Sequence, residues 1–220
     1  MQTTQRTFVF NALLFVVALL ALGAAYAQTG APSPEAPAAL PNGINFSGAY
    51  TPDDVAYFRD DLERLHRDLP EWWQYVLDAR PFTIVIDPRT ARGAIVAVTE
   101  CCDASGSGTV RFGYHLSEIS TGSDPDSQSA EARRVAFLGM LAHELTHVRD
   151  LRAGRFTVKT DRKSCVDAET SGLSQQLAIK RDLAAGASGS VAAWLTEQIR
   201  SENRDLHSRS FWDWYCAAFE

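Results

Sequence analysis

The chain has 220 residues, of which 45% are hydrophobic and 22% are charged, a composition typical of a globular domain and not of a disordered protein. Its 21 Lys and Arg residues stand against 27 Asp and Glu residues, so the formal net charge is −6. An acidic chain without a basic cluster gives no electrostatic basis for binding nucleic acid or an anionic membrane surface.

The first 27 residues are typical of a secretory signal peptide. Arg6 is their only charged residue, and an apolar run follows at Ala12–Leu22. Small residues at Ala25 and Ala27 fit a cleavage site after Ala27, which would leave no stable membrane span. The predicted location is therefore secreted, periplasmic or in the cell envelope. The alternative is an uncleaved membrane anchor, because the apolar stretch is nearly long enough to cross a bilayer.

Four cysteines follow this segment: Cys101, Cys102, Cys165 and Cys216. An even number of cysteines after a signal peptide predicts two disulfides in an oxidising compartment. Because a bridge between the adjacent Cys101 and Cys102 would be strained, each is expected to pair with Cys165 or Cys216. The alternative is a zinc site with four cysteine ligands, but the chain lacks the C-x-x-C spacing of such sites.

The folded domain is expected to span residues 51–220. Residues 28–50 before it are rich in Pro, Ala and Gly and are predicted to form a flexible segment. Thr51, followed by Pro52 and two acids, indicates the start of the first helix. A second short helix is expected from Pro70.

Three strand-like runs come next, at Phe82–Ile86, Ala94–Thr99 and Thr109–Leu116. Helical patterns then return over four segments, about 130–151, 164–185, 189–203 and 208–219. Ser164 and Asp167 resemble a capping box at the start of the second of these helices. The order of helices, a small sheet and more helices predicts an α+β fold in which the strands are segregated from most helices.

The strongest chemical signal is the stretch MLAHELTHVRD at residues 140–150, which contains His143, Glu144 and His147 in an H-E-x-x-H pattern. On a helix, residues four apart lie about 40° apart around the axis, so both imidazoles can face one ion. Glu144 is rotated away and could act on a water molecule beside that ion. This spacing is typical of zinc hydrolases. Gly139, one turn earlier, indicates that something approaches the helix closely.

A catalytic zinc needs a third protein ligand. A third histidine after the motif is excluded, because Asp150 and Ala153 occupy the positions where an extended motif carries Gly and His. Glu169 fits instead: it lies 22 positions (169 − 147) after His147, on the apolar stripe of the next predicted helix. A buried carboxylate needs a metal or a cationic partner, so the alternative is an ion pair with Arg or Lys.

This combination resembles the gluzincin group of zinc metallopeptidases over roughly residues 82–185. The resemblance implies a zincin-like fold, with a small mixed sheet of about three strands packed against the H-E-x-x-H helix and the following glutamate helix. It also implies one catalytic Zn²⁺ held by His143, His147 and Glu169, with Glu144 as general base. Thermolysin-like enzymes have Asp four residues after the glutamate, whereas this chain has Leu173, so no subfamily is assigned.

The expected function is that of a secreted zinc-dependent metalloendopeptidase acting on a peptide or protein substrate. Candidate oxyanion donors are Tyr114, His115, His207 and Tyr215, of which His207 and Tyr215 follow the glutamate helix, where gluzincins often place this residue. Asp150 is the candidate for orienting a ligand imidazole. A peptide would align with a sheet edge, either 94–99 or 109–116.

Two other classes of function stay open from the sequence. One is a secreted or envelope binding module that keeps zinc for stability only, which would show a fourth protein ligand. The other is a metal-free helical protein in which Glu169 pairs with Arg or Lys. Convergence of both histidine nitrogens and the Glu169 carboxylate on one point beside an open cleft would separate these hypotheses.

Overall fold

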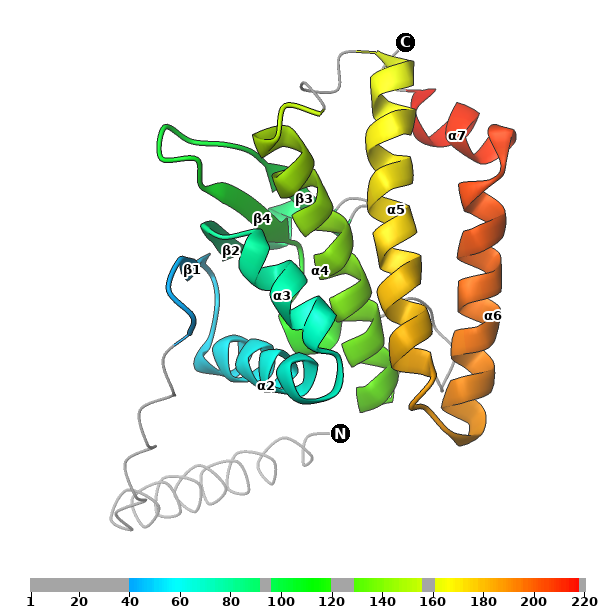
Figure 1. Cartoon of the computed structure of the whole chain (residues 1–220), viewed down its shortest axis with the longest axis horizontal. Helices are drawn as coiled ribbons and strands as arrows, with labels where there is room; N and C mark the ends of the chain where they lie inside the picture. The colour runs from blue at the N-terminus through cyan, green and yellow to red at the C-terminus, as the bar shows by residue number, and fades with distance from the viewer. Residues whose placement is uncertain (1–39, 92–95, 120–128, 156–160, 218–220) are drawn as a thin grey trace, which may run out of the picture. The chain divides into compact units, whose positions relative to one another are not determined.

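The computed structural model describes residues 40–91, 96–119, 129–155 and 161–217 (Figure 1). The predicted signal peptide, 1–27, and most of the predicted flexible segment, 28–50, lie outside these residues. In the described part of the chain, no helix combines the length and the apolar character needed to cross a membrane.

The described residues form an α+β domain with a four-stranded mixed sheet and six α-helices. Its elements in chain order are β1 (Ile44–Gly48), α2 (Pro52–Asp68), α3 (Pro70–Asp78), β2 (Phe82–Ile86), β3 (Ala97–Glu100), β4 (Gly108–Phe112), α4 (Ala130–Arg152), α5 (Arg162–Ala184), α6 (Gly189–Leu206) and α7 (Arg209–Tyr215). Short 3₁₀ turns at Pro88–Thr90 and Leu116–Glu118 flank the sheet strands. The predicted α+β class is confirmed, but the mixed sheet has four strands where about three were expected.

The sheet has the strand order β1-β2-β4-β3, in which β1, β2 and β4 are parallel and β3 runs antiparallel to β4 at one edge. Of the two predicted candidates for an edge, the run at 94–99 contributes residues 97–99 to the edge strand β3, and its residues 94 and 95 lie outside the described residues. The run at 109–116 contributes residues 109–112 to β4, which lies inside the sheet. β1 belongs to the segment predicted to be flexible. It is ordered because its backbone pairs with β2 and because Ile44 is buried in the core.

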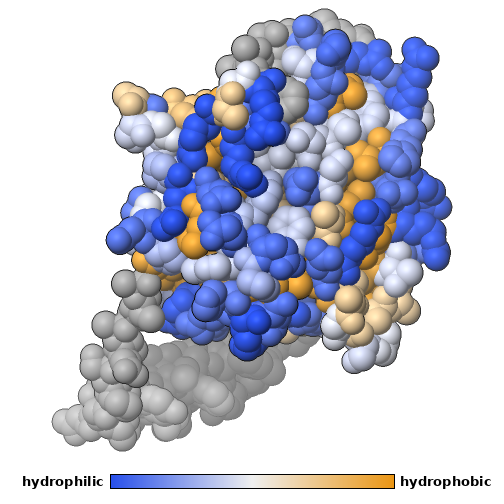
Figure 2. Space-filling model, in the orientation of Figure 1, coloured by the Kyte–Doolittle hydropathy of each residue, from blue (hydrophilic) through white to orange (hydrophobic). Residues whose placement is uncertain are grey.

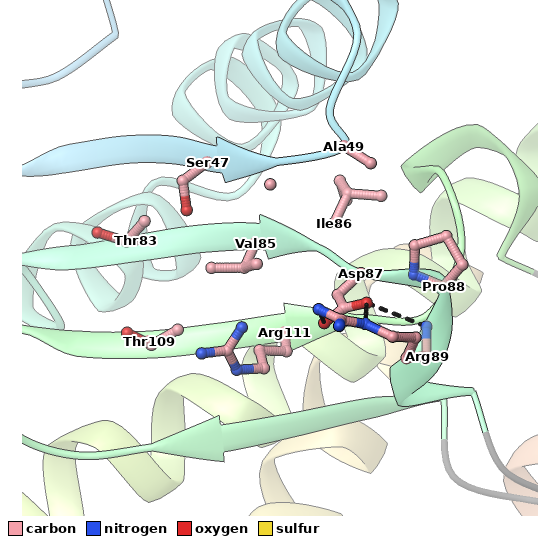
Figure 3. A pocket seen from close by; sticks show the side chains of 11 residues that line it. Ser47, Ala49, Thr83, Val85, Ile86, Asp87, Pro88, Arg89, Thr109 and Arg111 are labelled. Carbon is pink, nitrogen blue, oxygen red and sulfur yellow. Dashed lines mark hydrogen bonds and ion pairs between the residues drawn. The ribbon is translucent and has the colours of Figure 1, made fainter.

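Among the described residues, the helices lie on one face of the sheet and none lies on the other face (Figure 3). In β4, Val110 and Phe112 point into the core, whereas Thr109 and Arg111 are partly exposed. Figure 3 shows Thr109 and Arg111 on the face turned away from the helices, in a hollow of about 440 Å³. Ion pairs from Arg111 to Glu100 and from Arg89 to Asp87 neutralise the charges in this part of the sheet.

Three long helices, α4, α5 and α6, lie side by side with alternating direction (Figure 1). Ser129 caps the start of α4, and its hydroxyl accepts a hydrogen bond from the Ala132 amide. One apolar stripe of α4 is buried in the core that it shares with the sheet: Leu138, Leu141, Leu145 and Val148. The opposite side of α4 is covered by α5.

Figure 2 shows mainly hydrophilic residues on the face of the molecule that is turned to the viewer in Figure 1, with apolar residues gathered in a strip between α5 and α6.

The start of α5 differs from the predicted one. Its capping box joins Asp161 and Ser164, whose backbone amide donates to the Asp161 carboxylate at 2.7 Å. Asp167, predicted to form the box with Ser164, instead pairs with Lys163 one turn away. Because the helix begins at Arg162, two residues earlier than predicted, Ser164 takes the third helical position rather than the cap.

The predicted disulfide pairing is wrong. Cys165 pairs with Cys216 at a Cα separation of 5.9 Å, and Cys101 pairs with its neighbour Cys102. Cys165, in the first turn of α5, and Cys216, directly after α7, are both fully buried in one small apolar cluster with Trp212. Cys101 and Cys102 follow β3, so they belong to a different part of the fold from that cluster.

A buried carboxyl group on α2 makes the stability of the fold depend on pH. Asp61 is fully buried, and neither of its oxygens has a hydrogen-bond partner. Its nearest cation is the guanidinium of Arg134, at 3.6 Å. Burial, which Arg134 and Arg64 only partly offset, raises the pKa of the Asp61 carboxyl to about 7. The folded protein therefore holds this proton at pH values where the unfolded chain has released it.

We expect this difference in pKa to cost stability as the pH rises. The folded state has its full stability below pH 4, and it should lose about 2–4 kcal/mol between pH 4 and pH 7 through Asp61 alone. Asp61→Asn should remove this loss, so urea unfolding at pH 5 and pH 8 should show a smaller difference than in the wild type. Asp60→Asn, on the exposed neighbouring side chain, is the matched control. An unchanged pH dependence in Asp61→Asn would contradict the assignment.

Candidate metal centre

His143 and His147 lie one turn apart on α4, and both turn their Nε2 atoms toward Glu169 on α5. The Nε2 atom of His143 is 3.1 Å from one oxygen of the Glu169 carboxylate, and that of His147 is 3.7 Å from the other. The two imidazole centroids are 4.8 Å apart. The three residues that the sequence singled out as ligands are therefore neighbours in space.

This group could hold a metal ion. Potential ligand atoms of His143, His147 and Glu169 all lie within 4.8 Å of one another. Two atoms bound to the same tetrahedral zinc at about 2.1 Å are about 3.4 Å apart, close to the two nitrogen–oxygen distances found here. The donor set of two imidazoles and one carboxylate also suits zinc. Glu169 is only 5% exposed, so it presents its carboxylate to the imidazoles from inside the protein.

Two glycines allow α4 and α5 to approach closely. A Cβ at Gly172 would lie 2.7 Å from the Cδ2 and Nε2 atoms of His143, which is shorter than any normal contact. On α4, a Cβ at Gly139 would lie 2.6 Å from the Cε of Lys180. The close approach that Gly139 indicated from the sequence is therefore made by α5. Gly172, which sequence reasoning did not single out, sets the space for a ligand imidazole.

Glu144 is oriented by the edge strand. Its carboxylate accepts a hydrogen bond from the Thr99 hydroxyl on β3 at 2.7 Å, and that hydroxyl is also 3.0 Å from the Glu144 backbone carbonyl. Glu144 is buried, and it lines the same cavity as His143 and Glu169. The sheet edge, the H-E-x-x-H helix and α5 thus meet at one place.

Of the four candidate oxyanion donors, the structure brings one to this place. Tyr215, at the end of α7, lines the cavity, and its hydroxyl interacts with Glu169. Partial burial, together with the nearby charges of Glu169 and Glu144, raises the pKa of the Tyr215 hydroxyl. The disulfide at the adjacent Cys216 fastens this end of α7 to the first turn of α5.

The other candidates lie elsewhere or make other contacts. His207 is exposed at the end of α6 and does not line the cavity. Tyr114 is exposed, and the His115 ring contacts the Asp54 carboxylate at 2.8 Å, which raises the His115 pKa. Asp150, the candidate for orienting an imidazole, accepts a hydrogen bond from Ser171 on α5.

The cavity beside the metal-ligand group has a volume of about 410 Å³ and an open mouth. Residues from β3, α4, α5, α6 and α7 line it. It therefore offers both the reactive groups and room for part of a larger molecule.

Comparison of the chain with protein-family models, with curated protein sequences and with solved structures finds no match.

We expect Gly172→Ala to weaken metal binding. An Ala normally stabilises a helix interior by about 1 kcal/mol relative to Gly, but here the added methyl group would collide with His143. Zinc affinity measured by competition with a chelating dye should fall about 10–100-fold, the usual effect of disturbing the groups that orient a ligand. Gly186→Ala, whose methyl group would meet nothing closer than 3.8 Å, is the control. Wild-type zinc affinity in Gly172→Ala would contradict this account of the site.

Proposed function

We propose that this protein is an exported zinc-dependent metalloendopeptidase of the gluzincin type. The observation that carries the proposal is the convergence of His143, His147 and Glu169 beside the carboxylate of Glu144. Two imidazoles, a carboxylate from the following helix and an adjacent general base form the set of groups that zinc peptidases use. The mixed sheet with an antiparallel edge strand next to the H-E-x-x-H helix is consistent with a zincin-like fold.

In this proposal His143, His147 and Glu169 hold the zinc ion, which supplies a Lewis acid for activating water and polarising a carbonyl. Glu144 takes a proton from the attacking water and returns it to the leaving amine. The hydrogen bond from Thr99 keeps one oxygen of the Glu144 carboxylate in place. Tyr215 offers a hydroxyl that can donate a hydrogen bond to the oxyanion that develops on the substrate.

A peptide substrate is expected to bind along β3. This strand is a sheet edge, so its outer backbone groups are available for pairing with an extended chain. Ala97, the first residue of β3, and Val96 directly before it line the cavity that contains Glu144. A peptide paired with β3 would therefore pass close to the general base. Export is proposed from the predicted signal peptide at residues 1–27.

We expect Glu144→Gln to keep zinc and lose activity. The purified protein loaded with Zn²⁺ should cleave a quenched fluorescent casein and lose this activity to 1,10-phenanthroline. Glu144→Gln should bind one zinc ion per chain and fall about 10²–10⁴-fold in kcat/KM, the usual contribution of a general base. Glu71→Gln, on the exposed surface of α3, is the control for the loss of one charge. A zinc-loaded Glu144→Gln protein with full activity would rule out the proposed mechanism.

We expect Tyr215→Phe to lower kcat more than it changes KM. The loss of one donor to a developing oxyanion typically costs about 10²–10³-fold in kcat. Because Tyr215 also interacts with Glu169, zinc content should be measured in parallel, and it should remain at one ion per chain. Tyr50→Phe is the control, because Tyr50 is an exposed tyrosine outside the cavity lining. An unchanged kcat in Tyr215→Phe would exclude Tyr215 as the oxyanion donor.

A further inference from the structure

The cavity beside the metal ligands has an apolar wall and an acidic end, and we propose that this end is a subsite for a cationic side chain of the substrate, with Asp205 as the residue that selects it. The inference rests on the proposed peptidase function and adds a substrate preference to it.

The apolar wall comes from three helices. Met140 on α4, Leu173 on α5, and Phe211 and Trp212 on α7 all line the cavity. Leu173 stands four residues after Glu169, one turn further along α5, so the wall begins next to the metal ligand. A substrate side chain that leaves the reacting bond would therefore first meet apolar surface.

At the acidic end, Glu202 on α6 is already neutralised. Its Oε1 atom is 2.5 Å from the Nζ of Lys180, which is only 2% exposed. Its Oε2 atom accepts a hydrogen bond from the Gln176 side chain at 3.1 Å. Both oxygens of Glu202 are thus occupied, and the buried ion pair contributes no net charge to the cavity.

Asp205 differs from Glu202 in having no such partner. It lies three residues further along α6, on the same side of the helix as Glu202, and it lines the same cavity. In the described part of the chain its carboxylate makes no hydrogen bond and no ion pair. A bound divalent ion would balance the negative charges of Glu144 and Glu169. Among the described residues that line the cavity, Asp205 would then carry the one charge that has no opposite charge beside it.

A lysine or arginine side chain matches this arrangement. Each has an apolar stem that can lie along Leu173, Phe211 and Trp212, and a cationic end that can reach a carboxylate. The cavity volume of about 410 Å³ leaves room for such a side chain. An acidic side chain would meet the unpaired carboxylate of Asp205 and be repelled, so the same residue gives both selection and rejection.

The test uses the full zinc-loaded protein and three peptides that differ at one position. After the cleaved bond is mapped in a peptide mixture, the residues on either side of it are changed in turn to Lys, norleucine and Glu. Norleucine has the apolar stem of Lys without its charge. At the position that enters the subsite, the wild type should cleave the Lys peptide with a kcat/KM about 10-fold above that of the norleucine peptide. The Glu peptide should be the poorest substrate.

Asp205→Asn should reduce the Lys-to-norleucine ratio of kcat/KM to about 1. Asp53→Asn, at an exposed acid on α2 outside the cavity lining, removes the same charge and should keep the wild-type ratio. Cleavage without a preference for Lys on either side of the bond would overturn the subsite, and so would a preference that survives in Asp205→Asn. Either result leaves the peptidase function standing.

A binding measurement tests the subsite separately when the wild type cleaves none of the peptides. Calorimetry on zinc-loaded Glu144→Gln, with and without Asp205→Asn, measures the affinity for the Lys and norleucine peptides without turnover. If the Lys peptide binds more tightly than the norleucine peptide and Asp205→Asn removes this difference, the subsite is supported. This holds even if the wild type cleaves none of the peptides. A complete lack of cleavage would overturn the peptidase function and not the subsite. If Glu144→Gln with Asp205 intact binds the Lys and norleucine peptides with equal affinity, the subsite is overturned.

Discussion

The close contact between α4 and α5 is the constraint on which the candidate site depends. α4 contributes two imidazoles and α5 one carboxylate. At Gly139 and Gly172 the helices lie so close that an added methyl group would collide with the Lys180 and His143 side chains of the facing helix. Packing the helices this closely buries Glu169 and His147 together. The cost of burying the carboxylate is offset by the imidazoles that face it, and a metal ion would offset it further.

Around this contact the rest of the domain supplies the walls of the site. The sheet supports α4 through the apolar stripe and presents Thr99 at its edge to Glu144. α6 and α7 cover the other side and bring Tyr215 to Glu169. The chemistry is thus assembled from elements that are far apart in the chain, and each holds one group in place.

Features with a local origin could be predicted from the sequence. The extent of α4, predicted as about 130–151, follows from its helical pattern of apolar residues, and Glu169 was recognised because it lies on the apolar stripe of the next helix. Features that arise from pairing between distant segments could not be predicted. β1 is a short run whose order comes from its partner strand, and the contact of Gly172 with His143 requires the packing of two helices. The cysteine pairing failed for the same reason, because no local pattern tells which cysteines share a cluster.

The bond between Cys165 and Cys216 ties the site to the redox state of its surroundings. It joins the helix that carries Glu169 to the residue next to Tyr215, so it fastens one wall of the cavity to a metal-ligand helix. In a reducing cytosol, α7 would be held by non-covalent contacts alone. If the chain is exported as proposed, formation of this bond after export would complete the site, so the newly made protein would be latent inside the cell that produces it.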